Sequence, residues 1–316
     1  MRTLPARALS RALALAFGGL ALTGCGLGAG PAPSAVQLSV TRDFGNRVLH
    51  RSGALKLSGQ ETVMSLLVRN YAVATRYGGG FVQSIDGLSG GREGSQPVDW
   101  FYYDNGVQAS EGAAATNVHP GDHIWWDRHD WSQTQDVPAV VGSFPEPFLN
   151  GIGGRRYPVR IECADVAGYA CSTIKARLRM LGAPAAVAGL GGGGAPQSLR
   201  VMVGPWAAIG GDLGAQGIQR GPRDSGVYAL FSADGRTLTP LDQDGRRLAA
   251  LLAGTGLIAA TRQAEDAPVW VVTGTDEAGV QRAARAFDAA TLRDRFAVAL
   301  TAAGALPLPL PAGSAP

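Results

Sequence analysis

Apolar and polar residues alternate over short runs in the first half of the chain. Val36, Leu38 and Val40 are separated by polar residues, which is the two-residue period of a strand with one buried face. Similar runs, bounded by glycine-containing turns, predict strands over residues 81–85, 100–103 and 123–127. Asn105-Gly106 follows the second of these runs and favours a hairpin, because a type I′ turn needs positive φ at both central residues.

A helical pattern lies between the first two runs. Val63, Leu66 and Leu67 have helical spacing, and Ser58 and Glu61 stand before them at the spacing of a capping box. The pattern predicts one amphipathic helix of about three turns. Because a single apolar stripe needs one surface to cover it, the simplest fold is one helix packed on a small mixed sheet.

The second half of the chain has a different pattern. Runs of consecutive apolar residues alternate with helical segments, which favours an α/β sheet covered on both faces. The predicted strands are residues 157–162, 198–203, 226–231, 256–261 and 269–272, and the predicted helices are residues 173–181 and 277–287. The fold class expected for the whole chain is therefore α+β, with a mixed sheet and one helix followed by an α/β domain.

Prolines and glycines separate the two patterns. Residues 144–147 read Phe-Pro-Glu-Pro and residues 151–154 read Gly-Ile-Gly-Gly, so little regular structure is expected there. We predict a first domain over residues 36–148 and an α/β domain over residues 151–304. Residues 305–316 alternate Leu with Pro at their start and are expected to form a disordered tail.

The first 24 residues read as a targeting peptide. A basic start precedes an apolar run over residues 12–22, which is shorter than the about 20 residues that cross a bilayer. The run ends in Leu22-Thr23-Gly24-Cys25, which resembles the lipobox of bacterial lipoproteins. This resemblance implies cleavage before Cys25, a lipid such as palmitate on its thiol, and an extracytoplasmic chain anchored to the cell membrane. An ordinary secretory signal beside an unrelated cysteine is the alternative.

Charge and flexibility fit an anchored protein. Residues 25–35 are rich in Gly, Pro and Ala and would form a flexible tether. The formal net charge of +3 comes from residues 1–24, which hold three arginines and no acidic residue, so their removal leaves a neutral chain. A neutral chain offers little neutralisation of phosphates, and no nucleic acid partner is expected.

Two cysteines remain once Cys25 carries a lipid. Cys163 and Cys171 are eight residues apart in a chain expected to be exported, so a disulfide between them is one possibility. Two buried thiols are the other. The second half of the chain contains no histidine, so the two cysteines suggest neither a metal site nor a thiol nucleophile.

Four segments of the first domain occur in a recognisable order. They read Thr-Val-Met-Ser-Leu-Leu at residues 62–67, Gly-Phe-Val-Gln-Ser-Ile-Asp-Gly at 80–87, Trp-Phe-Tyr-Tyr-Asp-Asn-Gly at 100–106 and Gly-Asp-His-Ile-Trp-Trp at 121–126. Together they resemble the transcobalamin-like C-terminal domain, a β-grasp-like module of bacterial surface proteins, over about residues 36–131. The resemblance implies a β-grasp-like fold and makes a corrinoid the specific ligand to consider. The helical barrel that forms the other wall of the corrin cleft in the carriers is not recognisable in this chain.

Aromatic residues of this domain are the candidate ligand-binding groups. Tyr77, Phe81, Tyr103, Trp125 and Trp126 could form a flat platform for a planar ring, with the glycines after Tyr77 as a flexible lip. The alternative is that these side chains belong to the core. Strand alternation requires this for about half of the aromatics in the region.

A cluster of histidine and aspartate offers a metal-binding alternative. If residues 123–129 are extended, His123, Trp125, Asp127 and His129 share one face of a strand. Two imidazoles and a carboxylate could hold a metal, and one imidazole could ligate cobalt. A half-exposed strand with solvated charges is favoured instead, because alternate side chains stand about 7 Å apart, and no metal site is predicted.

Motifs for catalysis are missing from the sequence. Thr273-Gly274-Thr275-Asp276 precedes a predicted helix and could hold a phosphate, but Asp276 fits the helix N-cap better. No nucleophile elbow or paired-carboxylate motif is present, so no catalytic residue and no resident cofactor are predicted.

These patterns lead to a ranked set of functions. We expect an exported, membrane-anchored lipoprotein that binds a ligand without transforming it, with a corrinoid as the specific candidate. The alternative is a cell-surface protein-interaction or structural module that has no small-molecule ligand. A third hypothesis is an exported hydrolase that acts through the second domain, and it requires a nucleophile that the sequence does not identify.

Overall fold

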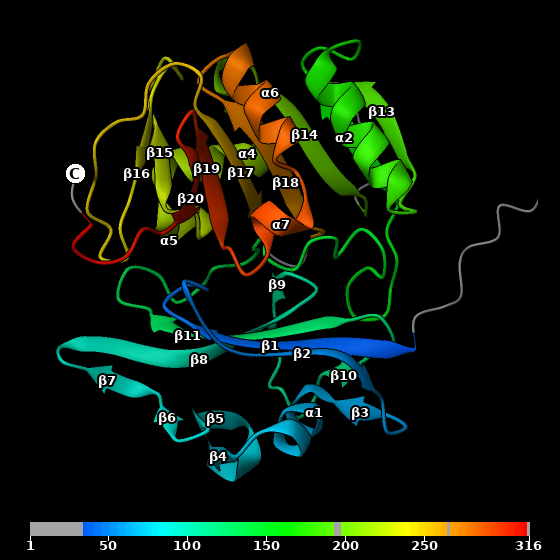
Figure 1. Ribbon diagram of the computed structural model, residues 1–316, viewed down its shortest axis with the longest axis vertical. Coiled ribbons are helices and arrows are strands. Elements are labelled where there is room, and N and C mark those ends of the chain that lie inside the picture. The colour runs from blue at the N-terminus through cyan, green and yellow to red at the C-terminus, as the bar shows by residue number, and fades with distance from the viewer. Residues whose placement is uncertain (1–33, 193–196, 264–265, 315–316) are drawn as a thin grey trace, which may run out of the picture. The chain divides into compact units, whose positions relative to one another are not determined.

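The computed structural model describes residues 34–192, 197–263 and 266–314. The expected targeting peptide, the lipidation site Cys25 and the tether up to residue 33 lie outside the described residues. The described residues form two larger β-sheets and three small ones of two or three strands, together with helices, and the connecting segment 131–158 joins the two larger sheets (Figure 1). The α+β class expected from the sequence is confirmed.

The N-terminal half contains short strands around one helix. Its strands are β1 (Ala35–Arg42), β2 (Arg47–Lys56), β3 (Glu61–Thr62), β4 (Val73–Arg76), β5 (Phe81–Ile85), β6 (Leu88–Ser89), β7 (Gly91–Glu93), β8 (Gln96–Asp104), β9 (Val107–Gln108), β10 (Asn117–Val118) and β11 (His123–Asp130). The helix is α1 (Val63–Asn70), and a 3-10 turn spans Tyr77–Gly79.

The N-terminal sheet has the strand order β2-β1-β11-β8-β7, and β9 pairs with β8. β1 and β11 run parallel in its centre, while β2 and β8 are antiparallel to their neighbours. α1 covers one face of this sheet (Figure 1). The first and last strands, β1 and β11, thus lie side by side and parallel at the centre of the sheet, and one helix covers a face. This arrangement is expected of a β-grasp-like module.

The start of α1 differs from the sequence prediction. Thr62 is the N-cap: its hydroxyl accepts a hydrogen bond from the Ser65 amide at 3.2 Å, and the Ser65 hydroxyl accepts one from the Thr62 amide at 2.9 Å. Ser58 and Glu61 do not cap the helix, because Glu61 pairs with β10 and its carboxylate binds Arg69 at 2.8 Å. The helix is therefore eight residues long, about two turns rather than three.

The predicted hairpin after β8 is confirmed. Asn105 and Gly106 have φ values of 52° and 83°, the positive values that a type I′ turn requires. The turn places Asn105 where its side-chain amide donates 2.8 Å hydrogen bonds to Asp122 Oδ1 and to the Gly151 carbonyl. One turn residue thus joins the N-terminal sheet to the connecting segment.

The C-terminal half contains a larger sheet with the order β13-β12-β14-β18-β17-β19-β20. Its strands are β12 (Val159–Cys163), β13 (Ala185–Gly189), β14 (Leu199–Pro205), β17 (Gly256–Thr261), β18 (Val269–Gly274), β19 (Ala297–Thr301) and β20 (Gly304–Leu308), and a separate hairpin pairs β15 (Ala229–Phe231) with β16 (Leu238–Pro240). The helices are α2 (Tyr169–Met180), α3 (Trp206–Ile209), α4 (Leu213–Arg220), α5 (Pro222–Ser225), α6 (Glu277–Arg285) and α7 (Ala289–Leu292).

Helices cover both faces of the larger sheet, as expected for its continuous apolar strands. Ile174 of α2 and Val280 of α6 pack on one face, and Ile209 of α3 and Ile218 of α4 pack on the other. β12, β13, β14 and β18 run parallel, whereas β17 is antiparallel to its neighbours. The apolar runs of the sequence are therefore strands buried on two sides.

Two segments of the C-terminal half differ from the prediction. The strand expected over 226–231 is shortened to β15 because α5 ends at Gly226, whose φ of 72° closes the helix. The tail expected to be disordered from residue 305 forms β20, which pairs with β19 at the edge of the sheet. Pro307 is tolerated there because an edge strand need not donate on its outer side.

The connecting segment is packed rather than extended through solvent. Phe144 and Phe148 are buried in the core under α2 and α6, and Trp270 lies against both rings. Val137 and Val140 belong to another core, which contains residues of both halves. Residues 144–154 contain little helix or strand, but they are not a loose linker, because the buried side chains of Phe144 and Phe148 anchor them.

Candidate functional site

The aromatic residues of the N-terminal sheet are buried on both of its faces. Trp126 packs on Tyr102 with ring centroids 4.9 Å apart, in the core that includes α1. Trp125 and Tyr103 point the other way and contact Phe296 of the C-terminal half, with ring centroids 5.3 and 5.5 Å from it. The strand alternation expected from the sequence is thus present, but each face has a core against it.

The expected aromatic platform is therefore not a surface of this structure. Tyr103 and Trp125 are 0% exposed and Trp126 is 2% exposed, so none of the three can meet a ligand without a separation of the packed layers. The physical reason is that Phe44, Tyr228 and Phe296 cover the sheet face that the sequence pattern predicts to be exposed to solvent. The aromatic face serves as a packing surface between the two halves of the chain.

Tyr77 and Phe81 are the two predicted ligand-binding residues that the structure leaves accessible at the surface. Tyr77 is 85% exposed and its ring meets that of Phe81 edge to face, with centroids 6.2 Å apart. The expected glycine lip is a 3-10 turn between β4 and β5, in which Gly78 has a φ of 71°. These two residues line neither of the cavities described below, so the structure separates them from the other predicted binding residues.

The histidine and aspartate cluster is a buried hydrogen-bond network. Asp127 Oδ1 lies 2.8 Å from His129 Nδ1, and Asp127 Oδ2 accepts hydrogen bonds from Thr41 and, at 2.8 Å, from the Gly45 amide. The ring of His129 stacks between Phe44 and Phe101, with centroids 4.5 Å from each. The half-exposed strand expected here is wrong, because every residue of β11 is buried. Among the residues that the structure describes, no group of side chains has the arrangement of a metal site.

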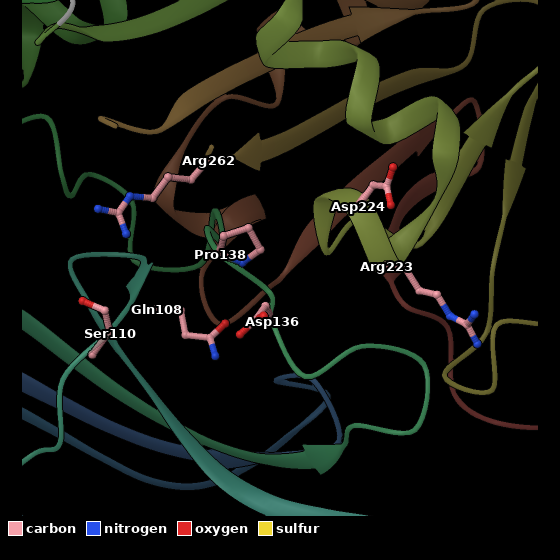
Figure 2. Close-up of a pocket in the computed structure, with 8 residues that line it drawn as sticks. Gln108, Ser110, Asp136, Pro138, Arg223, Asp224 and Arg262 are labelled. Atoms are coloured by element: carbon pink, nitrogen blue, oxygen red, sulfur yellow. The ribbon is translucent and has the colours of Figure 1, made fainter. Parts of the chain in front are cut away.

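A cleft between the two halves is the better candidate for a ligand site. It has a volume of about 390 Å³ and is lined by Gln108, Ala109 and Ser110 after β8, by Asp136 and Pro138 of the connecting segment, and by Arg223, Asp224 and Arg262 of the C-terminal half. Figure 2 shows Gln108 and Asp136 next to each other, with Arg262 and Ser110 on one side and Arg223 on the other. Clefts that combine residues of two packed units are common ligand sites.

Hydrogen bonds fix the floor of the cleft. Gln108 Oε1 accepts a hydrogen bond from the Val137 amide at 2.6 Å, and Gln108 Nε2 donates to the Gln135 carbonyl at 3.4 Å. The Gln108 backbone amide also donates to the Pro138 carbonyl at 3.2 Å. The connecting segment is thereby held against β9, and the polar surface of the cleft is formed before any ligand arrives.

Charged groups of both signs surround this floor. Arg262 Nε donates to the Asp266 carbonyl at 2.7 Å, and Arg223 Nε donates to the Gln133 carbonyl at 3.3 Å. The Asp224 carboxylate accepts from Arg220, whereas Asp136 is exposed at the cleft. A ligand in this cleft would meet amide, hydroxyl, carboxylate and guanidinium groups, which suits a polar molecule with both hydrogen-bond donors and acceptors.

A smaller cavity of about 170 Å³ adjoins the cleft. The two share Gln108, Ala109, Ser110 and Arg262, and Asp104 forms part of the wall of the smaller one. Asp104 Oδ2 accepts a hydrogen bond from the Gly153 amide at 3.2 Å, but Asp104 Oδ1 is buried without a hydrogen-bond partner in the described residues. Burial, and the nearby carboxyl of Asp122, raise the pKa of Asp104 to about 7.

Two further buried carboxyls lie close to Asp104. Burial raises the pKa of Glu146 to about 7, although Asn150 donates to it from its backbone amide at 2.8 Å and from its side chain at 2.5 Å. Burial also raises the pKa of Asp122, whose Oδ2 accepts from the His119 amide at 2.7 Å. Three acidic residues therefore lie close together beside the cleft: Asp104 from β8, Asp122 from the turn before β11, and Glu146 from the connecting segment.

The sequence carried little sign of this cleft. Gln108 follows a predicted hairpin, but Arg223 and Arg262 lie in short or irregular segments more than a hundred residues further on. A local sequence pattern does not indicate which distant residues lie together in the fold. The charges that flank the predicted strands would identify Arg262 only as a residue at the end of a strand.

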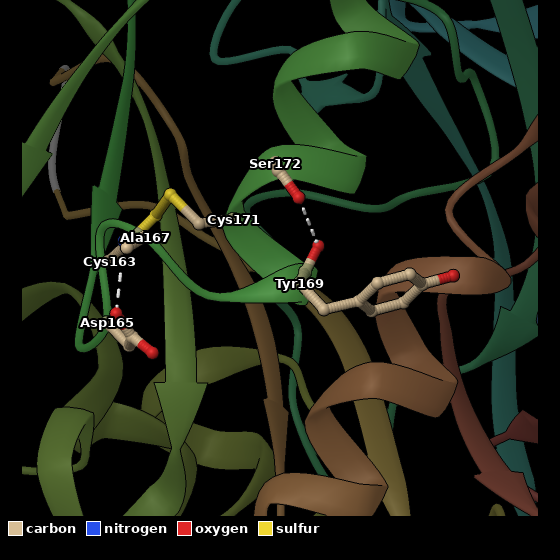
Figure 3. Close-up of a disulfide and its surroundings, with 6 residues drawn as sticks. All are labelled: Cys163, Asp165, Ala167, Tyr169, Cys171 and Ser172. Carbon is tan, nitrogen blue, oxygen red and sulfur yellow. Dashed lines mark hydrogen bonds between the residues drawn. A yellow bond between two sulfur atoms is a disulfide. The ribbon is translucent and has the colours of Figure 1, made fainter.

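The two cysteines of the C-terminal half form a disulfide. Cys163 ends β12 and Cys171 lies in the first turn of α2, with Cα atoms 6.0 Å apart (Figure 3). In the loop between them, Asp165 Oδ1 accepts a hydrogen bond from the Ala167 amide at 3.0 Å. Of the two possibilities left open by the sequence, the structure has the bridge, which ties a strand end to the helix that follows it.

The Thr273–Asp276 segment has the capping role favoured from the sequence. Asp276 is the N-cap of α6, and its Oδ1 accepts a hydrogen bond from the Gly279 amide at 2.8 Å. Its Oδ2 accepts another from the Gly254 amide at 2.8 Å. The carboxylate occupies the position that a bound phosphate would need.

Comparison with known proteins concerns the N-terminal half. Residues 60–130 match a family model described as a domain of unknown function, DUF4430. No curated protein matches the chain. In the part of the chain that the structure describes, no helix has the length and apolar character needed to span a membrane. The matched stretch runs from β3 through α1 to the end of β11 and leaves β1 and β2 outside it.

Proposed function

We propose that the chain is an exported lipoprotein, anchored to the membrane through Cys25, that binds a small molecule without transforming it. The ligand lies in the cleft lined by Gln108, Asp136, Arg223 and Arg262. The observation that carries this proposal is a cavity of about 390 Å³ to which both halves and the connecting segment contribute polar side chains. Small-molecule sites have this size and this position between packed units.

The ligand we propose is a corrinoid. The resemblance of residues 36–131 to the transcobalamin-like domain supports this choice, and the match of residues 60–130 to the DUF4430 family lies within that stretch. A corrin ring is surrounded by amide arms that both donate and accept hydrogen bonds. Gln108, Ser110 and Asp136 offer complementary groups at the cleft. Because a whole corrinoid is larger than the cavity, its arms enter the cleft and its ring lies across the mouth.

Titration of the purified protein with cobinamide and with cobalamin tests the proposal. Visible absorbance and heat should both saturate at micromolar concentrations. Gln108→Ala and Arg262→Gln should each weaken binding about tenfold, because each removes a hydrogen-bonding group from the cleft. Thermal unfolding of each variant checks that the fold is intact.

Tyr77→Ala is the matched control. Tyr77 is the most exposed aromatic side chain of the N-terminal half and lines neither cavity, so its loss should leave the affinity within about twofold. If Tyr77→Ala weakens binding and Arg262→Gln does not, the ligand lies at the turn before β5 and the cleft assignment is wrong. An absent signal at micromolar concentrations would refute the corrinoid.

A protein-interaction module is the second candidate. It is favoured by β2, a ten-residue strand at the edge of the N-terminal sheet in which no residue is buried. An exposed edge strand can accept a strand from another chain. On this hypothesis β2 takes part in binding and the cleft does not, so the absence of a corrinoid signal would leave it as the better account.

A further inference from the structure

A separate cavity of about 260 Å³ shares no lining residue with the cleft. It opens between β1, β2, β11, the connecting segment and the end of α7. The residues that matter for its chemistry are Ser39, Arg51, His123, Phe144, Pro145 and Arg293. No function assigned above uses this cavity.

Its inner wall carries a buried polar pair. Ser39 Oγ lies 2.9 Å from His123 Nε2, and both residues are more than nine-tenths buried. Burial lowers the pKa of His123 to about 4, against the opposing effect of the Asp294 carboxylate, so the imidazole is neutral near pH 7. The hydroxyl and the imidazole bind each other, and the imidazole also binds the Ser143 backbone, so the inner wall is polar without adding charge.

Two guanidinium groups supply positive charge at the same cavity. Arg51 donates to Asp294 Oδ2 from Nε at 2.7 Å and also from Nη2, and within the described residues its Nη1 makes no hydrogen bond. Within the described residues, no hydrogen bond or ion pair engages the Arg293 side chain. The charges of both arginines lower the pKa of His123, so they lie close enough to act on the inner wall.

The positive and negative charges around this cavity do not cancel. Asp294 neutralises one of the two arginines, and Arg295, which donates to Asn46 Oδ1 at 3.4 Å, adds another positive charge beside them. The cavity therefore has an excess of positive charge over a neutral polar floor. Phe144 and Pro145 add an apolar part of the wall, which suits the carbon skeleton of an organic anion.

We propose that this cavity binds a small oxyanion, either a carboxylate or a phosphate monoester. Arg51 and Arg293 hold its oxygens, since the planar guanidinium matches such groups with two parallel hydrogen bonds. Ser39 and His123 form the neutral polar wall at its inner end. This site is independent of the proposed corrinoid cleft, because the two share no residue.

Calorimetric titration of the full chain at pH 7.5 with inorganic phosphate and with acetate tests the proposal. At least one of the two should bind saturably, with a dissociation constant below about 10 mM. Arg293→Gln should weaken that binding about tenfold, and Ser39→Ala about threefold. The imidazole nitrogen resonances of His123 should move during the titration, which a remote binding site would not cause.

Arg179→Gln is the matched control. It removes one exposed arginine of α2 that lines neither the cleft nor this cavity, and it leaves the same net charge as Arg293→Gln, so its affinity should stay within about twofold of the parent. Equal weakening in the two variants would mean unspecific attraction and would overturn the site. So would the failure of both anions to saturate, or saturation without any response of His123.

Discussion

Asp104 connects the chemistry of the cleft to the stability of the chain. Its Oδ1 is buried without a partner in the described residues, and burial raises its pKa to about 7. The folded chain thus keeps a proton that the unfolded chain releases near pH 4. The unfolded state binds fewer protons between about pH 4 and pH 7, so this residue lowers stability as the pH rises through that window.

Asp104→Asn should remove this pH dependence. At pH 8 the variant should be more stable than the parent by up to about 4 kcal/mol, because it has no buried charge to form. At pH 4 the difference should nearly vanish, since the parent carboxyl is then protonated in the fold. Urea unfolding at both pH values measures the two free energies.

Asp136→Asn provides the comparison for that experiment. Asp136 is exposed, so the same change of charge there should produce no gain that depends on pH. If Asp104→Asn destabilises the chain equally at pH 4 and pH 8, the carboxyl is not protonated in the fold, and the account of the buried acids beside the cleft is wrong.

The strands show which features a sequence can carry. The alternation of His123 to His129, the turn at Asn105-Gly106 and the N-cap at Asp276 each depend on neighbouring residues, and each is present in the structure. The burial of β11 depends on Phe296 and Tyr228, which lie about a hundred or more residues away in the sequence. Periodicity told which side chains share a face, but it could not tell that a second layer covers that face.

The same distinction explains the predicted binding residues. Tyr103, Trp125 and Trp126 have the composition of a ligand platform, and equally that of a core between two layers. α1 buries Trp126 on one face of the sheet, and the C-terminal half buries Tyr103 and Trp125 on the other, so all three are core. The cleft residues were not predicted because their shared position depends on how the two halves pack, and no local pattern encodes it.

The disulfide acts at the level of one strand and one helix. It joins Cys163 at the end of β12 to Cys171 in α2, and both residues are buried in the core of the larger sheet. A bridge that closes a loop of this length, with a sequence separation of 8, stabilises a fold by about 2–3 kcal/mol through the entropy of the unfolded chain.

Replacing both cysteines by serine should lower the free energy of unfolding by about that amount. The double variant avoids a free thiol, and urea unfolding under non-reducing conditions measures the change. Corrinoid affinity should stay the same, since neither cysteine lines the cleft. An unchanged midpoint would mean that the bridge contributes no stability, and the entropic argument would fail.

The packing of the two halves gives the whole molecule its candidate function. The described residues belong to one compact unit, and the core that contains Phe44, Tyr103, Trp125 and Phe296 joins the two sheets. Two of the aromatic side chains suggested for ligand capture, Tyr103 and Trp125, hold the halves together. The polar groups at the edge of that contact, Gln108, Asp136, Arg223 and Arg262, line the cleft.

Hydrogen exchange with and without cobinamide tests this account most directly, because it locates the ligand on the unmodified protein. The account predicts slower amide exchange at residues 107–110, 136–140 and 222–226, which border the cleft, and unchanged exchange at residues 77–81. Protection confined to residues 77–81, or no protection anywhere at saturating cobinamide, would contradict it.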